Sequence, residues 1–235
     1  MQPYFYPYLG YFSLIKHTDK WIVFDSVQYI ERGWVNRNRI IHPTKPEATY
    51  ITIPVKKHSR EILIKDVVID TASPFQDHIL GQMEASYKKR APYYKQVISM
   101  VEEAFAQDFT DVVSLNIYIM KQVCNYLNIP FEYDIFSKMN LDIEEVSAPG
   151  EWALNISSTV GATEYINPPG GIDLFDARRF QEKQIELSFL KIHLNPYNQR
   201  KSCFIEGLSI LDVMMFCDSK QINKMLDDFE IIKKE

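Results

Sequence analysis

The sequence is poor in cysteine, in long apolar runs and in surplus positive charge, and each shortage excludes a class of protein. Three cysteines among 235 residues are too few and too widely spaced for a disulfide framework, so we expect reduced, buried thiols. No apolar run approaches the roughly 18 residues of a membrane span, and no secretory signal opens the chain. A formal net charge of -5 argues against a general nucleic-acid binder. We therefore expect a soluble cytoplasmic protein.

Several enzyme and metal motifs are also missing. The five histidines show no HxxxH-type ligand spacing and no cysteine pair suggests zinc, so we expect no metal site. The sequence contains no GxSxG elbow, no P-loop and no GxGxxG. His78, within a predicted helix, is a candidate general base, with a structural histidine as the alternative. The chemistry must therefore be sought outside the common motifs.

Apolar periodicity predicts a single domain over residues 1–235, with interleaved strands and helices of the α/β or α+β class. Strands are expected at 21–25, 62–69, 131–136, 163–167 and 185–194, and a β-hairpin from 39–41 and 49–55. Helices are expected at 13–18, 74–90, 92–107, 111–127, 151–160, 175–183, 208–216 and 221–229. The helices between about 74 and 128 form a helical subregion. We expect a central, mostly parallel sheet to join these parts.

The strongest candidate site is the stretch DSVQYIERGWVNRNRI, residues 25–40. It follows a predicted buried strand, and open α/β sheets bind ligands at the carboxyl ends of their strands. Its arginines have planar donor groups that suit phosphate or carboxylate, and they are Arg32, Arg37 and Arg39. Its amide side chains suit sugar hydroxyls or a base edge, and they are Gln28, Asn36 and Asn38. Asp25 is the candidate general base, because burial at a strand end would raise its pKa. A solvated hairpin with alternating charges is the alternative.

Two later stretches are weaker candidates. SSTVGATEYINPPGG (157–171) gathers hydroxyls and glycines that could approach phosphate, although turns use the same residues. NPYNQRKSCF (195–204) follows a long predicted strand and offers Tyr197 and Gln199 to a substrate, with a surface loop as the alternative. Asp212 and Glu164 are further carboxylates that could act as a base.

The opening stretch, MQPYFYPYLGYF, is rigid, aromatic and almost uncharged. Its prolines fix the backbone, and Gly10 would admit close approach of a ligand. Tyrosine couples a large face to a polar tip, so the tyrosines predict a stacking wall for a sugar ring or a base. The substrate-binding candidates of this stretch are Gln2, Tyr4, Tyr8, Gly10 and Tyr11.

These motifs together resemble the WbqC-like family over nearly the whole chain. The resemblance rests on QPYFYPYLGYF, then D-x-V-Q-Y and W-x-N-R-N, then GATEYIN…GG, Tyr197-x-Gln199 and LSILDVMMF. It implies a transferase of bacterial surface-polysaccharide (O-antigen) biosynthesis that modifies a nucleotide- or lipid-linked amino sugar by acyl or aminoacyl transfer to its amine. Tyr8 stands where the family often has Trp, and Met1 stands where many members have His. A catalytic role for that His therefore does not carry over.

A looser similarity concerns the opening of HxGH nucleotidyltransferases. It implies an N-terminal βαβ-like unit and ATP as a substrate, although PYLGYFSLI here replaces the His-x-Gly-His core. One alternative function is therefore a degenerate, adenylate-forming relative of those enzymes. A second is a non-catalytic sugar- or nucleotide-binding protein of a polysaccharide assembly complex, and a third is an interaction protein whose aromatic N-terminus docks a partner. ATP or a nucleotide-sugar is expected as substrate rather than as resident cofactor, and a homo-oligomer stays open.

Overall fold

Short strands and helices alternate along the chain, as the periodicity predicts. The computed structural model describes residues 1–234. The α-helices are α1 (Leu9–Lys16), α2 (Phe75–Tyr87), α3 (Tyr94–Phe105), α4 (Val112–Leu127), α5 (Phe136–Met139), α6 (Glu151–Thr159), α7 (Ala177–Glu182), α8 (Ile210–Phe216) and α9 (Ser219–Leu226). The strands are β1 (Trp21–Val23), β2 (Arg37–Ile41), β3 (Ala48–Thr52), β4 (Tyr133–Ile135), β5 (Glu164–Asn167), β6 (Glu186–Ile192) and β7 (Phe229–Lys233). Two short 3-10 helices are η1 (Ile64–Asp66) and η2 (Pro169–Leu174).

Helices α2, α3 and α4 occupy the part of the chain where the periodicity predicts helices. Apolar side chains at three- and four-residue spacing face the core, as in α2, where Ile79, Met83 and Tyr87 are buried. Helix α4 begins where the Asp111 carboxylate accepts a hydrogen bond from the Ser114 N–H at 2.8 Å. It ends at Asn128, whose φ of 55° closes the helix in the left-handed conformation. Local capping thus sets the bounds that periodicity only approximates.

The prediction of a central, mostly parallel sheet is wrong. The described residues form three small sheets: a parallel pair β1–β4, an antiparallel pair β2–β3, and the sheet β5–β6–β7. In the last sheet β5 and β6 are parallel and β6 and β7 are antiparallel. The β2–β3 hairpin is confirmed. No βαβ unit opens the chain either, because residues 1–7 form no strand and the parallel partner of β1 comes only after α4.

Two segments account for part of this difference. The apolar run 62–69 is not a strand: it contains η1 and makes only isolated bridges, which join Gln28 to Leu63, Val55 to Ile69 and Val68 to Asp111. The chain end was predicted as helix to residue 229, but α9 stops at Leu226 and the next residues form β7. Both segments are apolar and short, a pattern that fits several structures and is decided by tertiary contacts.

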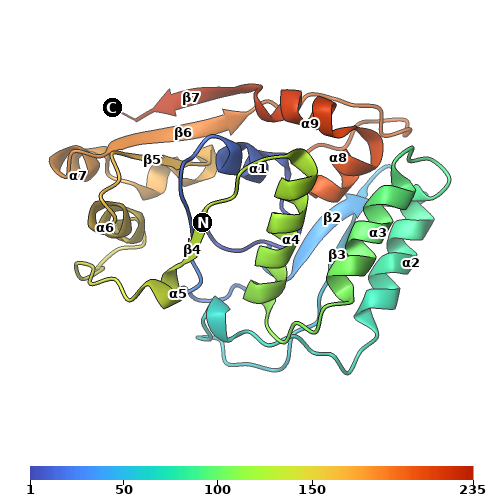
Figure 1. Cartoon of the computed structure of the whole chain (residues 1–235), viewed down its shortest axis with the longest axis horizontal. Helices are drawn as coiled ribbons and strands as arrows, with labels where there is room; N and C mark the ends of the chain where they lie inside the picture. Colours follow the sequence, from blue (N-terminus) through green and yellow to red (C-terminus); the bar gives the residue numbers. More distant parts are fainter. Residues whose placement is uncertain (235) are drawn as a thin grey trace.

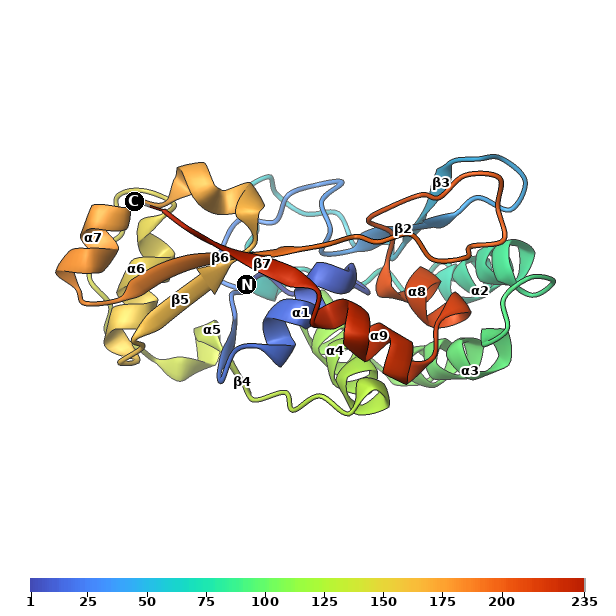
Figure 2. The same cartoon turned by 90° about the horizontal axis from the view of Figure 1, so that it is seen from above.

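The hydrophobic core has a large part and a small part. Figures 1 and 2 show the β5–β6–β7 sheet with α6 and α7 toward one end of the long axis, and the hairpin with α2 and α3 toward the other. The small cluster lies at the sheet and consists of Leu154, Phe175, Phe180, Ile185, Leu187 and Phe189. Strand β6 links the two clusters, because Phe189 belongs to the small one and Leu190 to the large one.

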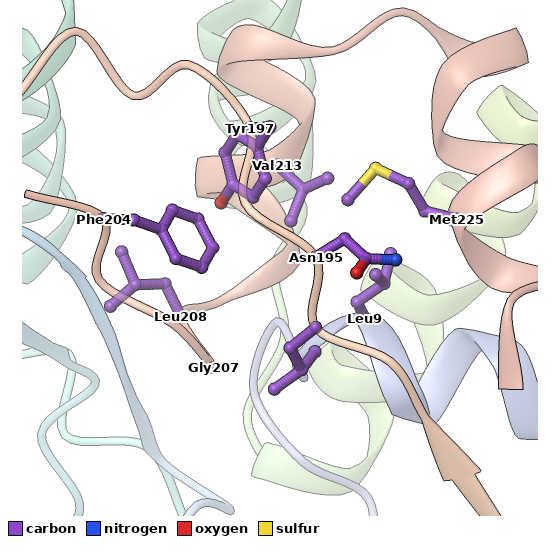
Figure 3. A pocket seen from close by; sticks show the side chains of 9 residues that line it. Leu9, Asn195, Tyr197, Phe204, Gly207, Leu208, Val213 and Met225 are labelled. Carbon is purple, nitrogen blue, oxygen red and sulfur yellow. The ribbon is translucent and has the colours of Figure 1, made fainter. Parts of the chain in front are cut away.

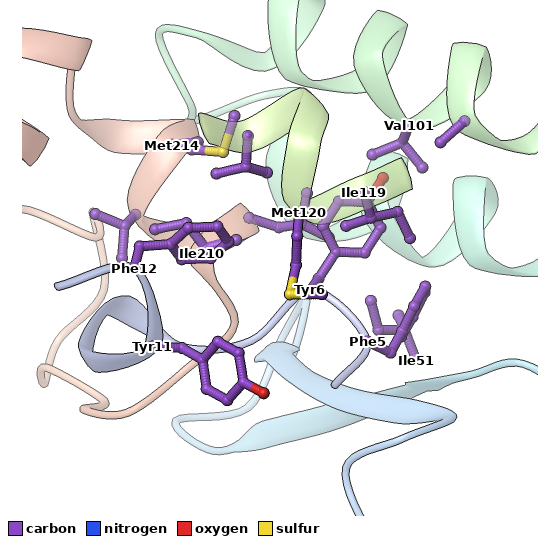
Figure 4. Close-up of a cluster of buried hydrophobic side chains, with 14 of the residues drawn as sticks. Phe5, Tyr6, Tyr11, Phe12, Ile51, Val101, Ile119, Met120, Ile210 and Met214 are labelled. Carbon is purple, nitrogen blue, oxygen red and sulfur yellow. The ribbon is translucent and has the colours of Figure 1, made fainter. Parts of the chain in front are cut away.

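The aromatic opening segment lies inside the large core. Figure 4 shows Phe5, Tyr6, Tyr11 and Phe12 among buried side chains of α3, α4, α8 and the hairpin. The exposed fraction of each of these four side chains is at most 1%. The segment is therefore part of the protein interior rather than an exposed arm. Among residues 1–234, none of the helices is long and apolar enough to cross a membrane.

Candidate functional site

The repeat Asn-Arg-Asn-Arg at residues 36–39 is divided between two faces by the alternation of an extended chain. Successive side chains of a strand point to opposite faces. Asn36 and Asn38 are therefore buried, whereas Arg37 and Arg39 point to the outer face of the hairpin and are partly exposed. The asparagines of this repeat therefore pack in the interior, and its arginines place positive charge on the outer face of the hairpin.

The outward arginines lie against two exposed aromatic rings. The guanidinium carbon of Arg37 lies 4.1 Å from the ring centroid of Tyr50, and that of Arg39 lies 5.6 Å from that of Trp34. The two rings are stacked, with centroids 6.4 Å apart and planes at 30°. Trp34 is 38% exposed and Tyr50 is 41% exposed. We call Trp34, Arg37, Arg39 and Tyr50 the arginine–aromatic face.

Both guanidinium groups on this face are held by backbone carbonyls and not by carboxylates. Arg37 Nη2 donates to the carbonyl oxygen of Arg32, and Arg39 Nη2 donates to that of Gly207 at 3.1 Å. The Nε of each is enclosed without a partner in the described part of the chain. Within residues 1–234 neither arginine forms an ion pair with an acidic side chain. The enclosed Nε is out of a ligand's reach, but both side chains are partly exposed, so their remaining Nη N–H groups can bind an anion.

The spacing of the two arginines suits a ligand with more than one phosphate. Residues i and i+2 of a strand are roughly 7 Å apart along the chain, so both forks can reach one diphosphate. Stacking on aromatic rings limits the rotamers of each arginine, which lowers the entropy lost on binding. The exposed ring surface beside the guanidinium groups can take the flat face of a sugar or base. The face can therefore bind a phosphate group and an adjoining ring together.

The other predicted polar residues of the stretch 25–40 flank this face. Arg32 is exposed, has a φ of 59°, and contributes its carbonyl oxygen to Arg37. Gln28 is exposed and its Nε2 donates to the carbonyl oxygen of Arg60 at 2.6 Å. A direct substrate contact from Arg32 or Gln28 stays a prediction. Trp34 and Tyr50 were not among the predicted site residues.

Comparison with known proteins identifies the family. The family model described as the WbqC-like protein family matches residues 2–224. The chain belongs to the WbqC-like family. It is also similar to a protein of Mycobacterium tuberculosis (strain ATCC 25618 / H37Rv) described as "Uncharacterized protein Rv1507c", with 28% identity over 216 residues that cover 91% of this chain and 90% of that protein. No solved structure gives a significant match.

In this WbqC-like chain, buried amides hold the opening segment. Asn38 Nδ2 donates to the carbonyl oxygens of Phe5 at 2.9 Å and Tyr6 at 2.8 Å. Asn116 Nδ2 likewise donates to the carbonyl of Pro3 at 2.9 Å. Asn36, the other buried amide of the stretch, accepts from the Tyr29 hydroxyl and donates to the Ile53 carbonyl, each at 2.8 Å. Asn36 and Asn38 thus use their donors within the fold, and their predicted contact with substrate stays a prediction.

The predicted tyrosine wall is only partly exposed. Tyr11 is buried and its hydroxyl donates to the carbonyl oxygen of Gln2, whereas Tyr4 and Tyr8 are half-buried. Burial raises the pKa of Tyr11 well above its usual range, and the neighbouring phenols of Tyr4, Tyr8 and Tyr165 raise it further. Tyr165 belongs to the candidate stretch 157–171, so the structure brings this stretch close to the opening segment.

Gly10 makes room for a side chain of the chain itself. A Cβ atom at Gly10 would lie 2.6 Å from ring atoms of Tyr8, so only glycine lets that ring lie over the start of α1. The close approach that the sequence suggested for a ligand is thus already made by Tyr8. Whether Gly10 also contacts a ligand stays a prediction.

Asp25, the predicted general base, lies in a separate cluster. Its carboxylate is 2% exposed and accepts hydrogen bonds from Ser137, at 3.0 Å from the backbone N–H and 2.5 Å from the hydroxyl. Ser26 donates more weakly, at 3.4 Å. Asp25 therefore joins the end of β1 to the start of α5. Its catalytic role stays a prediction.

Tyr197 and Gln199 meet Asp212 in a buried polar cluster. The Asp212 carboxylate accepts from the hydroxyls of Tyr87 at 2.7 Å and Tyr197 at 2.5 Å, and from Gln199 Nε2 at 2.8 Å. Burial raises the pKa of Asp212 to about 6, while these three donors act in the opposite direction. We call these four residues the Asp212 cluster.

Beside this cluster lies a partly open cavity that is too small for a substrate. Figure 3 shows Tyr197, Phe204, Val213 and Met225 around it, and its volume is about 10 Å³. That volume is about the minimum that holds one water molecule. A substrate contact for Tyr197 and Gln199 stays a prediction, and the interior here offers no room for one.

His78, the other predicted catalytic residue, lies on the exposed side of α2. It does not belong to the cluster around Asp25. It lines an open groove between α2 and the far end of the hairpin. Glu164 is exposed on β5. Within residues 1–234 its side chain forms no hydrogen bond with the other predicted site residues. The sequence candidates therefore fall into several clusters, of which the arginine–aromatic face is the best formed for binding a ligand.

Proposed function

We propose that the chain is a transferase of bacterial surface-polysaccharide biosynthesis that acts in the cytoplasm on a nucleotide- or lipid-linked amino sugar. The observation that carries the proposal is the arginine–aromatic face, where Arg37 and Arg39 are stacked on aromatic rings and have N–H groups that no carboxylate of residues 1–234 occupies. Guanidinium forks bind phosphate, and aromatic faces bind sugar rings or bases. A phosphate-linked sugar is a ligand that uses both.

In the reaction that we propose, the amine of the sugar attacks the carbonyl carbon of an acyl-adenylate. A C–N bond forms, the bond from the carbonyl carbon to the phosphate oxygen breaks, and AMP leaves. The amine loses one proton to a general base, for which we propose Asp25. Supporting this choice, the Asp25 carboxylate is buried and hydrogen-bonded in a fixed position at the end of β1.

Thermal shift against ATP, nucleoside diphosphates and nucleotide-sugars tests the binding part. A ligand that binds only the folded chain at 100 times its Kd stabilises it by about 2.7 kcal/mol. Arg37→Gln and Arg39→Gln should each weaken binding by about tenfold or more, because each removes charge-assisted hydrogen bonds. Arg60→Gln is the matched control, since Arg60 is an exposed arginine outside the face. Unchanged affinity in both face variants would disprove the proposed phosphate site.

Product detection by mass spectrometry tests the catalytic part. Asp25→Asn should abolish transfer, whereas Ser137→Ala, which removes one hydrogen bond to the same carboxylate, should keep most of it. Equal losses in the two variants would assign Asp25 a structural role only. If nucleotide-sugar binding survives every carboxylate substitution and no donor yields product, the chain is a binding protein of the assembly complex and not a transferase. A response to ATP alone would favour the adenylate-forming alternative.

A further inference from the structure

The most exposed large apolar side chain of residues 1–234 belongs to a tight turn just before the arginine–aromatic face. This side chain is Ile30, which is 64% exposed. The Gly33 N–H donates to the Ile30 carbonyl oxygen at 3.0 Å and closes the turn. A Cβ atom at Gly33 would lie 2.8 Å from that oxygen, so the turn requires glycine. Local backbone geometry therefore holds Ile30 on the surface, next in space and sequence to the exposed ring of Trp34.

A second loop, the one that follows β3, is held against this turn. Gln28 Nε2 donates to the Arg60 carbonyl oxygen at 2.6 Å, and the Tyr29 N–H donates to that of Ile62 at 2.8 Å. The Tyr29 ring also meets the His58 ring edge-on, with centroids 5.2 Å apart. The two loops therefore form one surface, and it is fixed by hydrogen bonds before any partner arrives.

This part of the chain is basic in an otherwise acidic protein. Residues 24–66 contain eight lysines and arginines and five acidic residues, a net charge of +3, whereas the rest of the chain carries -8. Within residues 1–234, seven of these eight cations form no ion pair: Arg32, Arg37, Arg39, Lys56, Lys57, Arg60 and Lys65. Glu31 and Glu61 are exposed in the same loops and offset part of the charge. We call the exposed residues Ile30, Arg32, Lys56, Lys57 and Arg60 the basic edge.

Apolar and cationic side chains on one surface suit an anionic lipid bilayer. Each lysine or arginine near such a bilayer strengthens binding by roughly fivefold. Tryptophan is favoured at the level of the headgroups, and an exposed isoleucine gains by leaving water for the acyl boundary. The phosphates of a nucleic acid would use the cations of the basic edge but would offer nothing apolar to Ile30. A bilayer surface is therefore the partner that uses both kinds of side chain.

We propose that the basic edge docks the protein on the surface of an anionic lipid bilayer, with Ile30 and the neighbouring Trp34 at the level of the headgroups. The docking is reversible, because one aliphatic side chain and a few cations make a weak anchor. It depends on neither arginine of the arginine–aromatic face, and it does not rest on the function proposed above.

Vesicle flotation with the full chain tests the docking. Vesicles of phosphatidylcholine with about 30% phosphatidylglycerol should bind the chain at least about tenfold more tightly than vesicles of phosphatidylcholine alone at roughly 50 mM salt. Most of this difference should disappear at roughly 500 mM salt, where exposed charges are screened. Equal binding to both kinds of vesicle, or binding to neither, would overturn the proposal. Duplex DNA that binds as tightly as the anionic vesicles would assign the cations to nucleic acid and overturn it too.

Charge variants locate the cationic part of the surface. The double variant Lys57→Gln with Arg60→Gln should weaken binding to anionic vesicles by about tenfold or more. Lys95→Gln with Lys121→Gln is the matched control, because it removes the same charge from exposed positions of α3 and α4. It should change binding by less than about twofold. Equal losses in the two double variants would mean that the net charge of the chain, and not the basic edge, decides binding.

Apolar variants locate the inserted part. Ile30→Ser should weaken vesicle binding by about fivefold or more. Leu174→Ser, which removes another exposed apolar side chain (51% exposed), should leave binding unchanged. Anionic vesicles should shift tryptophan emission to shorter wavelength, and Trp34→Phe should remove the shift, because Trp21 is buried and Trp152 is half-buried. An Ile30→Ser variant with unchanged affinity, or a shift that persists in Trp34→Phe, would contradict the proposal.

The docking and the proposed function can fail separately. A chain that nucleotide-sugars stabilise but that binds no vesicle keeps the proposed function and loses the docking. Vesicle binding that survives Arg37→Gln and Arg39→Gln supports the docking, even where no phosphate ligand stabilises the chain.

Discussion

The arginine–aromatic face and the Asp212 cluster both gather charged and aromatic side chains beside the hairpin, but their polar groups are engaged differently. Asp212 accepts hydrogen bonds from Tyr87, Tyr197 and Gln199, all supplied by the chain itself. Arg37 and Arg39 each donate to one backbone carbonyl and keep N–H groups for an outside partner. A charge that the chain satisfies completely supports the fold, whereas a positioned charge with open donors is available to a ligand.

Removing the Asp212 carboxylate should give the largest effect on stability. Asp212→Ala leaves the Tyr87 and Tyr197 hydroxyls buried without their acceptor, and the Gln199 amide keeps only its bond to the Ile205 carbonyl. We expect the free energy of unfolding to fall by about 3–4 kcal/mol, measured by urea denaturation. Arg37→Gln, on the exposed face, should cost less than about 1 kcal/mol. Similar losses in the two variants would remove the distinction between the clusters.

The Asp212 cluster should also give the protein a pH-dependent stability. Burial raises the pKa of Asp212 from 3.8 to about 6, so the folded state favours the protonated form. This contribution is fully present below about pH 4 and is lost as pH rises through about 6, a difference of about 3 kcal/mol in all.

Asp212→Asn, which cannot titrate, provides the measurement. The free energy of unfolding of the native chain relative to this variant should fall between pH 4 and pH 7, and urea denaturation across that range would detect it. Asp19→Asn, at an exposed position, is the control. Parallel pH profiles for the native chain and Asp212→Asn would show that this carboxylate titrates normally.

Local patterns predicted most helices and the hairpin but not the arrangement of strands. Helices α2, α3 and α4 follow from apolar spacing and from capping residues such as Asp111, which act within a few residues. The pairing of β1 with β4 joins Trp21 to Tyr133 across the hairpin and three helices. A strand of three residues has too short a sequence pattern to indicate which strand it pairs with, so the order of the strands could not be predicted.

The arginines of the candidate site could be predicted from the sequence, but the aromatic ring of Tyr50 could not, because its position depends on strand pairing. The stretch 25–40 was recognised by its arginines, and period-two alternation could have separated Arg37 and Arg39 from Asn36 and Asn38. Tyr50 could not be found in this way, because its place beside Arg39 depends on the register of β2 and β3. The opening segment was recognised by its aromatic residues, yet their burial depends on contacts with α4 and α8 far along the chain.

Asn38 and Arg39, which are neighbours on β2, allow the same comparison between a side chain that the fold uses and one that is open to a ligand. Asn38→Ala leaves the buried carbonyl of Phe5 without its donor and that of Tyr6 with the Ser209 hydroxyl alone, and should lower the free energy of unfolding by about 2 kcal/mol. Arg39→Gln, one residue further, should lower it by less than half as much and should affect phosphate binding instead. Thermal denaturation with and without a nucleotide-sugar measures both effects. Loss of binding in Asn38→Ala at a temperature where it is fully folded would assign Asn38 to the ligand.

Two tyrosines of the opening segment test whether every buried polar group supports the fold. Tyr6 and Tyr11 are each 1% exposed. The Tyr11 hydroxyl donates to the Gln2 carbonyl, whereas the Tyr6 hydroxyl is enclosed and has no partner in residues 1–234. Tyr11→Phe should therefore lower the free energy of unfolding by about 1 kcal/mol, and Tyr6→Phe should raise it by about 1 kcal/mol, because an unpaired buried hydroxyl is unfavourable.

Urea denaturation of both variants measures this pair, and each tyrosine serves as the control for the other. The substitution is the same, the burial is the same, and only the hydrogen bond differs. If Tyr6→Phe is instead destabilising, its hydroxyl has a partner, and the interior around residue 6 is better satisfied than the contacts of this chain indicate. Opposite signs in the two variants would show that the hydrogen bond, and not burial of the ring, decides what each hydroxyl contributes to the opening segment.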